Sequence, residues 1–307
     1  MNPMRYRQLG RSGLTVSVVG LGCNNFGFVA KMGLDETRAV VDAALEGGVN
    51  LLDTSRSYGD SEVLLGEVLK GRRDDVVLAT KFASRGLDQN LPAAKASRWY
   101  IRRSVEESLR RLQTDRIDLY QLHFPDGVTP FEETLSALDD LVHQGKVLYA
   151  GSSNLAAWQV TEAEWVARSR GITRFVSAQN NYSLLERSAE AELIPACEQA
   201  GVGLLPYYPL ASGLLTGKYR RGRERPSGTR LDGRDIPEER WERVEKLAGF
   251  AEERGRSLLD LAFAGLLAQP VVASVIAGAT SPEQVRANVA AGEWVLSEED
   301  RAALASI

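Results

Sequence analysis

Eight short apolar runs, each followed by a segment with helical periodicity, are the feature that most constrains the fold of this 307-residue chain. The runs are rich in Val, Leu and Ile and do not alternate with polar residues, which is typical of parallel strands covered on both faces. Repeated strand–helix units favour a parallel sheet, and eight of them favour an α/β fold closed into a (β/α)8 TIM barrel. The predicted strands cover residues 18–22, 49–53, 76–81, 117–122, 147–152, 175–179, 202–207 and 271–277.

Helices are predicted between these runs, where apolar residues recur at helical spacing and glycines supply stop signals. Gly47-Gly48 ends the first helical segment and Gly201 the sixth. The predicted helices cover residues 35–46, 61–69, 97–112, 129–143, 156–169, 189–200 and 257–268. A helix at 282–291 and a shorter one from Ser297 form a C-terminal helical extension.

Two segments stand outside the repeat. Residues 6–9 and 15–17 flank Arg11-Ser12-Gly13 and predict an N-terminal β-hairpin at the bottom of the barrel. Residues 219–240 are rich in Gly, Arg and Pro and predict a long surface loop, which in a compact fold is usually functional or mobile. No linker or change of composition marks a second domain, so residues 1–307 are interpreted as one domain.

Composition excludes several classes of function. The formal net charge of −4 gives no basic field for nucleic acid. Cys23 and Cys197 lie far apart and form neither a disulfide framework nor a metal-ligand spacing, so no metal is expected. Without an apolar run long enough for a membrane span, or the apolar stretch of a signal peptide, a cytoplasmic enzyme or binding protein for small molecules is expected.

Polar side chains occupy the ends of the predicted strands. One run ends at Asp53, the next at Lys81, and His123 follows a third. The carboxyl ends of barrel strands meet at the face that carries the chemistry, so these groups are expected to converge there. Alone, Asp53 could cap a helix, Lys81 could be solvated, His123 could be a buried core group and Tyr58 a packed loop aromatic. Because all four fall at one rim, we interpret them as one functional set in which Asp53 pairs with Lys81.

A series of short motifs also follows a fixed order along the chain. The motifs are Asp53-Thr54 with Tyr58-Gly59 and Ser61-Glu62, Thr80-Lys81, Leu122-His123-Phe124-Pro125-Asp126, Gly145-Lys146-Val147, Gly151-Ser152-Ser153-Asn154, Gln179-Asn180-Asn181-Tyr182-Ser183, Tyr208-Pro209-Leu210 and residues 213–218. Their types and order resemble the aldo-keto reductase family over residues 6–291.

The resemblance implies an oxidoreductase that reduces aldehyde or ketone carbonyls with NADPH, NADH being possible. It implies that Asp53, Tyr58, Lys81 and His123 form a catalytic tetrad. Ser153, Asn154 and Gln179 would hold the nicotinamide carboxamide, and Tyr207 would stack on the ring. The whole implied cofactor site comprises Gly22, Asp53, Ser153, Asn154, Gln179, Tyr207, Leu210, Ser212, Leu214, Lys218, Gly278, Ala279, Gln284 and Asn288.

Carbonyl reduction needs hydride at carbon and a proton at oxygen. The cofactor would bring the hydride, and Tyr58 is the expected general acid. A free phenol has a pKa of about 10, and a nearby Lys81 ammonium is expected to lower it. Asp53 would orient Lys81, and His123 would hydrogen-bond the substrate oxygen.

The expected substrate pocket has an aromatic and apolar wall, which suits a hydrophobic carbonyl compound. Trp99 has the alternative of packing between loops. Arg56, close to Tyr58, either contacts an anionic substrate group or is solvated. The predicted wall residues are Cys23, Asn25, Phe26, Trp99, Phe124 and Tyr208.

Three questions stay open at this stage. A nicotinamide-binding, redox-sensing regulatory subunit is the alternative function, because some barrel relatives associate with ion channels. A Schiff-base reaction at Lys81 is chemically possible, although the carboxamide-binding series argues against it. NADPH preference would depend on Arg286 or on the arginine-rich loop of Arg220, Arg221, Arg223 and Arg225, which is expected to order over the bound cofactor. Self-association is possible.

Overall fold

The computed structural model describes residues 3–88, 90, 94–219, 221–222, 231 and 235–307. Within these residues an eight-stranded parallel sheet has the strand order β10-β3-β4-β5-β6-β7-β8-β9. Strands β3 to β9 therefore pair in chain order, as a sheet built from repeated strand–helix units requires. The bounds are β3 Val19–Gly22, β4 Leu51–Asp53, β5 Val77–Phe82, β6 Ile117–Leu122, β7 Val147–Ser153, β8 Phe175–Gln179, β9 Gly203–Leu204 and β10 Val275–Gly278.

The sheet closes between β9 and the segment that leads into β10. Leu204 forms a parallel bridge with Val272, and its N–H donates to the carbonyl of Val271 at 2.7 Å. Ile276 donates to the carbonyl of Pro206 at 3.2 Å. Regular pairing along β9 is shorter than the predicted strand 202–207 because Pro206 has no N–H to donate. These contacts confirm the predicted (β/α)8 barrel.

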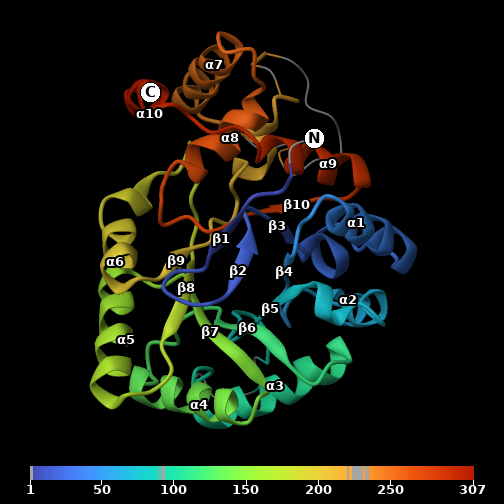
Figure 1. Ribbon diagram of the computed structural model, residues 1–307, viewed down its shortest axis with the longest axis vertical. Coiled ribbons are helices and arrows are strands. Elements are labelled where there is room, and N and C mark those ends of the chain that lie inside the picture. Colours follow the sequence, from blue (N-terminus) through green and yellow to red (C-terminus); the bar gives the residue numbers. More distant parts are fainter. Residues whose placement is uncertain (1–2, 89, 91–93, 220, 223–230, 232–234) are drawn as a thin grey trace.

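Helices surround the barrel (Figure 1). Helices α1 to α6, α8 and α9 form the ring, in which α9 packs between α8 and α1. Their bounds are α1 Leu34–Glu46, α2 Ser61–Val68, α3 Arg98–Leu112, α4 Phe131–His143, α5 Ala157–Arg170, α6 Leu193–Ala200, α8 Leu258–Leu267 and α9 Pro282–Ala291. Short helical turns also occur at η1 Asn25–Val29, η2 Arg73–Asp75, η3 Ser188–Glu190 and η4 Ala211–Thr216. None of the described helices has the length and apolar character needed to cross a membrane.

Two helices lie outside the ring, at the top of Figure 1: α7 (Glu238–Glu252) and α10 (Glu298–Ala305). Helix α10 confirms the predicted C-terminal extension, whereas α7 is absent from the prediction, which assigned its first residues to a loop. The buried residues Val244, Leu247 and Phe250 recur at helical spacing, so the signal was present. This face of α7 belongs to a separate hydrophobic cluster with residues of α8, η4 and α10.

The predicted N-terminal hairpin is confirmed as β1 (Tyr6–Gln8) paired with β2 (Thr15–Ser17). Leu9 and Val16 are fully buried in the cluster that fills the barrel. Gly10 has a φ of +58°, and a Cβ there would lie 2.5 Å from the carbonyl oxygen of Gly201. Arg7 donates to the carbonyls of Leu267 and Val272 at 2.8 and 2.7 Å. The hairpin therefore closes the barrel at the end from which the strands begin.

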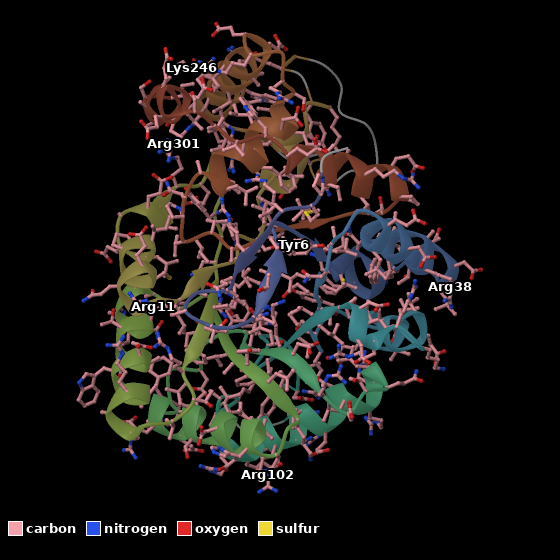
Figure 2. All side chains as sticks on the ribbon, in the orientation of Figure 1. Tyr6, Arg11, Arg38, Arg102, Lys246 and Arg301 are labelled. Carbon is pink, nitrogen blue, oxygen red and sulfur yellow. The ribbon has the colours of Figure 1, made fainter. Side chains whose placement is uncertain are left out.

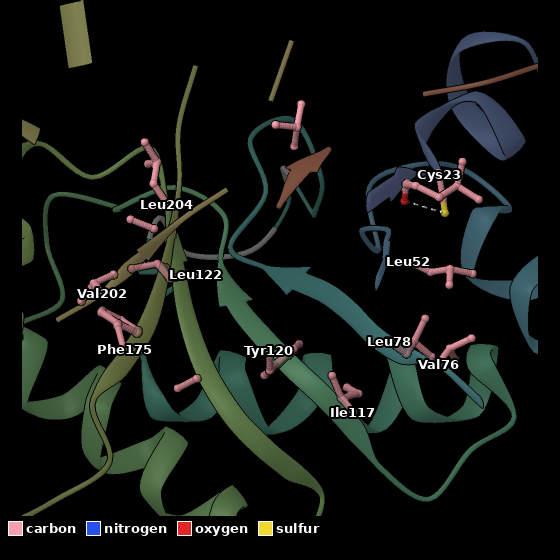
Figure 3. Packing of buried hydrophobic residues seen from close by; sticks show 14 of the residues in the cluster. Cys23, Leu52, Val76, Leu78, Ile117, Tyr120, Leu122, Phe175, Val202 and Leu204 are labelled. Atoms are coloured by element: carbon pink, nitrogen blue, oxygen red, sulfur yellow. Dashed lines mark hydrogen bonds between the residues drawn. The ribbon is translucent and has the colours of Figure 1, made fainter. Parts of the chain in front are cut away.

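Alternate residues of each strand face two different cores, as strand geometry requires. Outward-facing residues such as Leu52 and Leu78 pack under the helices in the largest cluster, seen at close range in Figure 3. The inward-facing cluster fills the barrel with Leu9, Val16, Leu51, Ala79, Leu119, Val176, Leu205, Ala273 and Ile276. Beyond this apolar layer, towards the carboxyl ends of the strands, the inward positions become polar.

Candidate active site

Strand periodicity brings the predicted polar residues to one end of the barrel. Asp53 follows the interior residue Leu51 by two positions on β4, and Lys81 follows Ala79 by two positions on β5. Side chains two residues apart on a strand share a face, so Asp53 and Lys81 point into the same opening. His123 comes directly after β6, and its N–H donates to the carbonyl of Phe82 at the end of β5.

Asp53 and Lys81 form a buried ion pair with every charged atom engaged. Lys81 Nζ lies 2.6 Å from Asp53 Oδ2 and donates to the carbonyl of Thr54 at 2.9 Å. The other carboxylate oxygen, Oδ1, accepts from Gln179 Nε2 at 2.8 Å and from Gln121 Nε2 at 3.0 Å. Burial lowers the pKa of Lys81, but Asp53 and then Tyr58 raise that pKa by more, so the ammonium persists at neutral pH.

Tyr58 lies in the loop after β4, and its ring is next to Lys81 and His123. Lys81 Nζ is 5.1 Å from the ring centroid, and the His123 ring meets it edge-on at 6.0 Å. Burial raises the pKa of Tyr58, Lys81 lowers it and Asp53 raises it, with a net rise above the ordinary value. Lys81 thus acts in the expected direction, yet burial outweighs it, and the group is a protonated phenol at neutral pH.

His123 is held by hydroxyl groups and stays neutral. Its Nδ1 lies 2.9 Å from Ser84 Oγ and 3.3 Å from Ser55 Oγ. Burial, then the charges of Lys81 and Arg85, lower the pKa of His123 to about 3. A neutral imidazole carries one N–H, and because a hydroxyl can donate as well as accept, Nδ1 can accept from Ser84 while the proton on Nε2 is left for a ligand.

The residues expected to hold a carboxamide form a connected row along the ends of β7 and β8. Ser153 Oγ donates to the carbonyl of Gln179 at 2.7 Å. Asn154 Nδ2 donates to the carbonyl of His123 at 2.9 Å, and Asn154 Oδ1 accepts from the Tyr207 hydroxyl at 2.7 Å. Asn154 adopts a left-handed backbone with a φ of +57°. The row is therefore connected to His123 through Asn154 and to Asp53 through the side chain of Gln179.

The loop from Tyr208 to Lys218 has an unusual concentration of left-handed backbone. Tyr208, Ala211 and Ser212 have φ values of +53°, +46° and +60°, and Gly213 follows at +102°. Non-glycine residues in this region are costly and cluster at functional sites, and backbone amides in such turns form anion-binding concavities. Lys218 is exposed and has no carboxylate partner among the described residues. With Leu210 and Leu214 in the same turn, this loop fits a pyrophosphate.

The remaining cofactor predictions gather where β10, β3 and α9 meet. Gly278 pairs with Gly22 across β10 and β3. Gln284 Oε1 accepts from the N–H of Thr280 at 3.0 Å, at the N-terminal end of α9. Ala279 and Asn288 are buried there as well. A helix N-terminus favours an anion, so this junction fits a phosphate at the adenosine end of a dinucleotide.

The basic residues expected near that end are only partly described. Arg286 is exposed and lies 3.7 Å from Glu283. Arg221 pairs with Glu238 and, at 3.4 Å, with Glu245. The other predicted residues of this loop, Arg220, Arg223 and Arg225, lie outside the described residues.

The predicted pocket residues divide into two groups. Phe124 stacks on His123 with centroids 4.7 Å apart, Tyr208 is 49% exposed beside Tyr207, and Trp99 is 57% exposed near Arg103 on α3. All three keep exposed surface, Phe124 beside His123 and Tyr208 beside Tyr207, whereas Trp99 contacts Arg103 of its own helix.

The second group does not line an opening. Cys23 and Phe26 are completely buried in the core, and Cys23 Sγ points at the carbonyl of Leu21 (Figure 3). Asn25 is 4% exposed and donates to the carbonyl of Ala279 at 3.1 Å. Cys23 and Phe26 lie within the hydrophobic core and Asn25 is bonded to Ala279, so the expected exposed pocket wall is corrected for these three residues. Gly27 permits the burial, since a Cβ on it would lie 2.3 Å from the carbonyl oxygen of Tyr58.

Arg56 departs from both of its expected roles. It is 8% exposed, lies 2.7 Å from Asp88 and 2.6 Å from Glu107, and also donates to the Tyr100 hydroxyl at 3.1 Å. It is therefore neither solvated nor free for a substrate anion. It ties the Tyr58 loop to α3 and to the loop after β5.

Three residues that contact Asp53 or His123 were not predicted from the sequence. Gln121 is buried on β6 and donates to Asp53, and the signal was an uncharged polar residue one position before the end of a largely apolar run. Ser55 and Ser84 contact His123, but serines in loops carry no pattern that singles them out. The prediction concentrated on strand ends and so omitted these three side chains.

Comparisons with known proteins extend over nearly the whole chain. A model of the Aldo/keto reductase family matches residues 18–307. The chain is 39% identical to the "Uncharacterized oxidoreductase YrpG" of Bacillus subtilis (strain 168), over 96% of this chain and 93% of the relative. It is 36% identical to a "Probable voltage-gated potassium channel subunit beta" of Oryza sativa subsp. japonica, over 94% and 91% of the two chains. It is 33% identical to "Norsolorinic acid reductase B" of Dothistroma septosporum, over 97% and 80%.

Proposed function

The chain belongs to the aldo/keto reductase family of oxidoreductases, and on that premise we propose that it reduces an aldehyde or ketone to an alcohol with NADPH, Tyr58 acting as the general acid. The observation that carries the proposal is the meeting of a protonated phenol, a buried ammonium and a neutral imidazole at the mouth of the barrel. Members of this family generally use a nicotinamide cofactor, which when bound supplies the hydride.

Tyr58 is the group with a proton to give. Its raised pKa keeps the phenol protonated at neutral pH, so it can donate a hydrogen bond to a carbonyl oxygen before it transfers the proton. As negative charge develops on that oxygen, the neighbouring Lys81 ammonium stabilises the phenolate that would result. General acid catalysis of this kind contributes about 10²–10⁴-fold to the rate.

His123 orients the substrate oxygen without competing for the proton. With a pKa of about 3, its imidazole is not an acid at neutral pH, and an Nε2–H would act only as a hydrogen-bond donor. Ser84 and Asn154 hold this residue at its side chain and at its carbonyl, which limits the rotation of the donor. Preorganised donors of this type cost no reorganisation during the reaction.

The cofactor would be held by three groups of residues. Ser153, Asn154 and Gln179 provide amide and hydroxyl groups for a carboxamide, with Tyr207 beside them as a stacking surface. The loop that contains Ser212 and Lys218 would bind the pyrophosphate. The end of β10 and the start of α9 would take the adenosine part. NADPH preference is proposed from Arg286, an exposed cation on α9 near the site assigned to the adenosine end, where NADPH carries its additional phosphate.

The test is steady-state oxidation of NADPH with a panel of aliphatic and aromatic aldehydes and ketones. We expect turnover with several members of the panel, and a lower Kd for NADPH than for NADH in fluorescence titrations. Tight cofactor binding without any turnover above the rate of free cofactor would contradict the proposed reaction.

A regulatory subunit is the second candidate, favoured by the similarity to a protein named as a potassium channel subunit beta. Such a protein would bind the cofactor and oxidise it slowly or not at all. Single-turnover measurements with prebound NADPH and a reactive aldehyde separate the two candidates, because a sensor releases little alcohol even under these conditions.

A Schiff-base enzyme is disfavoured by the state of Lys81. An amine must lose its proton to attack a carbonyl, whereas the pKa of Lys81 is raised and its nitrogen is bonded to Asp53 and Thr54. Borohydride treatment in the presence of an aldehyde substrate should therefore leave the mass of the protein unchanged.

A further inference from the structure

Arg85 lies at the edge of the candidate active site, in the loop that follows β5. Its guanidinium carbon is 4.4 Å from the centroid of the Phe124 ring, and Phe124 stacks on His123 at 4.7 Å with an interplanar angle of 22°. Phe124 thus contacts both the exposed cation and the imidazole assigned to the substrate oxygen. A ligand bound to His123 and lying against Phe124 would extend towards Arg85.

The charge of Arg85 has no carboxylate partner among the described residues. The acidic groups of the adjoining loops are engaged elsewhere. Asp88 binds Arg56 and the Tyr100 hydroxyl, at 2.7 and 2.8 Å. Asp126 accepts from the backbone N–H groups of Ala96, Val128 and Thr129. An exposed arginine beside an active site with no internal partner is available for an anion.

The field of this guanidinium reaches into the site. It contributes to the low pKa of His123, after burial and Lys81, and it also acts to lower the pKa of Tyr207. His123 is the residue assigned to the substrate oxygen, and Tyr207 is the one assigned to the nicotinamide ring. The cation therefore lies close enough to act on a bound substrate.

Cofactor phosphates do not account for Arg85. The groups assigned to them, the loop of Ser212 and Lys218 and the start of α9, follow β9 and β10. Arg85 follows β5, which β3 and β4 separate from β10 in the sheet order. A substrate that enters beside Phe124 is the ligand that would meet this arginine.

We infer that Arg85 selects carbonyl substrates that carry a carboxylate remote from the reacting carbonyl. A guanidinium lying on an aromatic ring keeps its N–H edges free, and those edges match a carboxylate with two parallel hydrogen bonds. Phe124 lies between the imidazole and the guanidinium, so its ring separates the groups that would bind the two polar ends of the substrate. This inference rests on the proposed function and adds the substrate class to it.

The experiment compares 4-carboxybenzaldehyde with its methyl ester, methyl 4-formylbenzoate, at saturating NADPH. For the wild-type chain we expect kcat/KM to favour the acid by roughly tenfold. In Arg85→Met this preference disappears, mainly through a higher KM for the acid, while Arg85→Lys keeps part of it. Because Arg85 is exposed, added NaCl also reduces the preference of the wild-type chain.

Arg102→Met is the matched control. Arg102 is an exposed arginine on α3 that points away from the body of the protein (Figure 2). The Arg102→Met variant should leave both the activity and the preference for the acid over the ester unchanged. Thermal melts of all variants verify that the fold persists.

Three outcomes would overturn the inference: equal kcat/KM for acid and ester in the wild-type chain, an Arg85→Met variant that loses both substrates in the same proportion, or a preference retained in that variant. The first and third leave the reductase proposal intact. Absence of any NADPH oxidation with either aldehyde would refute the proposed function itself, and the substrate class with it.

Discussion

The side-chain amide of Gln179 donates a 2.8 Å hydrogen bond to Asp53, the carboxylate that pairs with Lys81. A residue proposed to bind the nicotinamide carboxamide is therefore part of the network that fixes the catalytic ammonium. Binding of a cofactor to Gln179 would change the donors available to Asp53, and Gln121 would remain as the amide that holds the same oxygen atom.

Replacing Gln121 should separate catalysis from cofactor binding. In Gln121→Leu, Asp53 Oδ1 loses a donor, whereas Gln179 keeps its shorter bond to Asp53 and loses only its 3.5 Å bond to Gln121, so Lys81 is held less firmly and kcat falls by about tenfold. The Kd for NADPH should stay within about twofold of the wild-type value, since Gln121 is not assigned to the cofactor. Gln179→Leu should lower both kcat and the affinity for NADPH. Stopped-flow hydride transfer and fluorescence titration measure the two effects, and an equal loss of affinity in both variants would argue against this division.

Tyr58→Phe removes the proton donor with little change of shape. We expect kcat/KM for aldehyde reduction to fall by about 10²–10⁴-fold while NADPH affinity is retained. Tyr6→Phe is the control, because Tyr6 lies on the hairpin at the opposite end of the barrel, where it donates to the carbonyl of Gly48, and this variant should keep full activity. Near wild-type turnover by Tyr58→Phe would remove Tyr58 from the role of acid.

Lys81→Met should destabilise the fold as well as abolish activity. The substitution leaves the buried Asp53 without its counter-charge, and breaking a buried pair in this way costs about 3–5 kcal/mol of unfolding free energy. Lys70 pairs with Glu67 at 2.7 Å on the surface, so Lys70→Met should cost less than about 1 kcal/mol. Urea denaturation of the two variants provides the comparison. Similar losses in both would show that burial of the Lys81 pair does not matter energetically.

Acidification should lower stability through His123. The folded-state pKa is about 3 against an ordinary value of 6.5, so between pH 6 and pH 4 the unfolded chain binds a proton that the native imidazole does not. The unfolding free energy therefore falls as pH decreases through this window, by up to about 1 kcal/mol per pH unit. His123→Asn should show a shallower slope than the wild-type chain in urea melts at each pH, and identical slopes would contradict the cited pKa.

The positions of Asp53, Lys81 and His123 could be predicted because strand geometry is local. Residues two apart share a face, and the ends of parallel strands meet, so the apolar runs alone place these groups together. Gln121 was accessible to the same logic, since it lies on β6 two residues before His123, which directly follows that strand.

The burial of Cys23 and Phe26 could not be predicted in this way. It depends on how closely the turn at residues 25–29 approaches the Tyr58 loop, a contact permitted by Gly27 and Gly59. A Cβ on Gly59 would lie 2.2 Å from the carbonyl oxygen of Gly27. Such docking between segments about 30 residues apart leaves no periodic signal. The ion pairs of Arg56 could not be predicted for the same reason, because its partners Asp88 and Glu107 come from other elements.

The hairpin at the base of the barrel has a consequence for synthesis on the ribosome. It is translated long before its partners, because the carbonyls that receive Arg7 and Arg5 belong to Leu267, Val272 and Gly292. Until those residues leave the exit tunnel, no completed barrel exists into which Leu9 and Val16 can pack. A nascent chain that lacks them therefore exposes both apolar side chains. Chaperone capture of stalled chains should therefore persist until translation has passed the last strand, and then end abruptly.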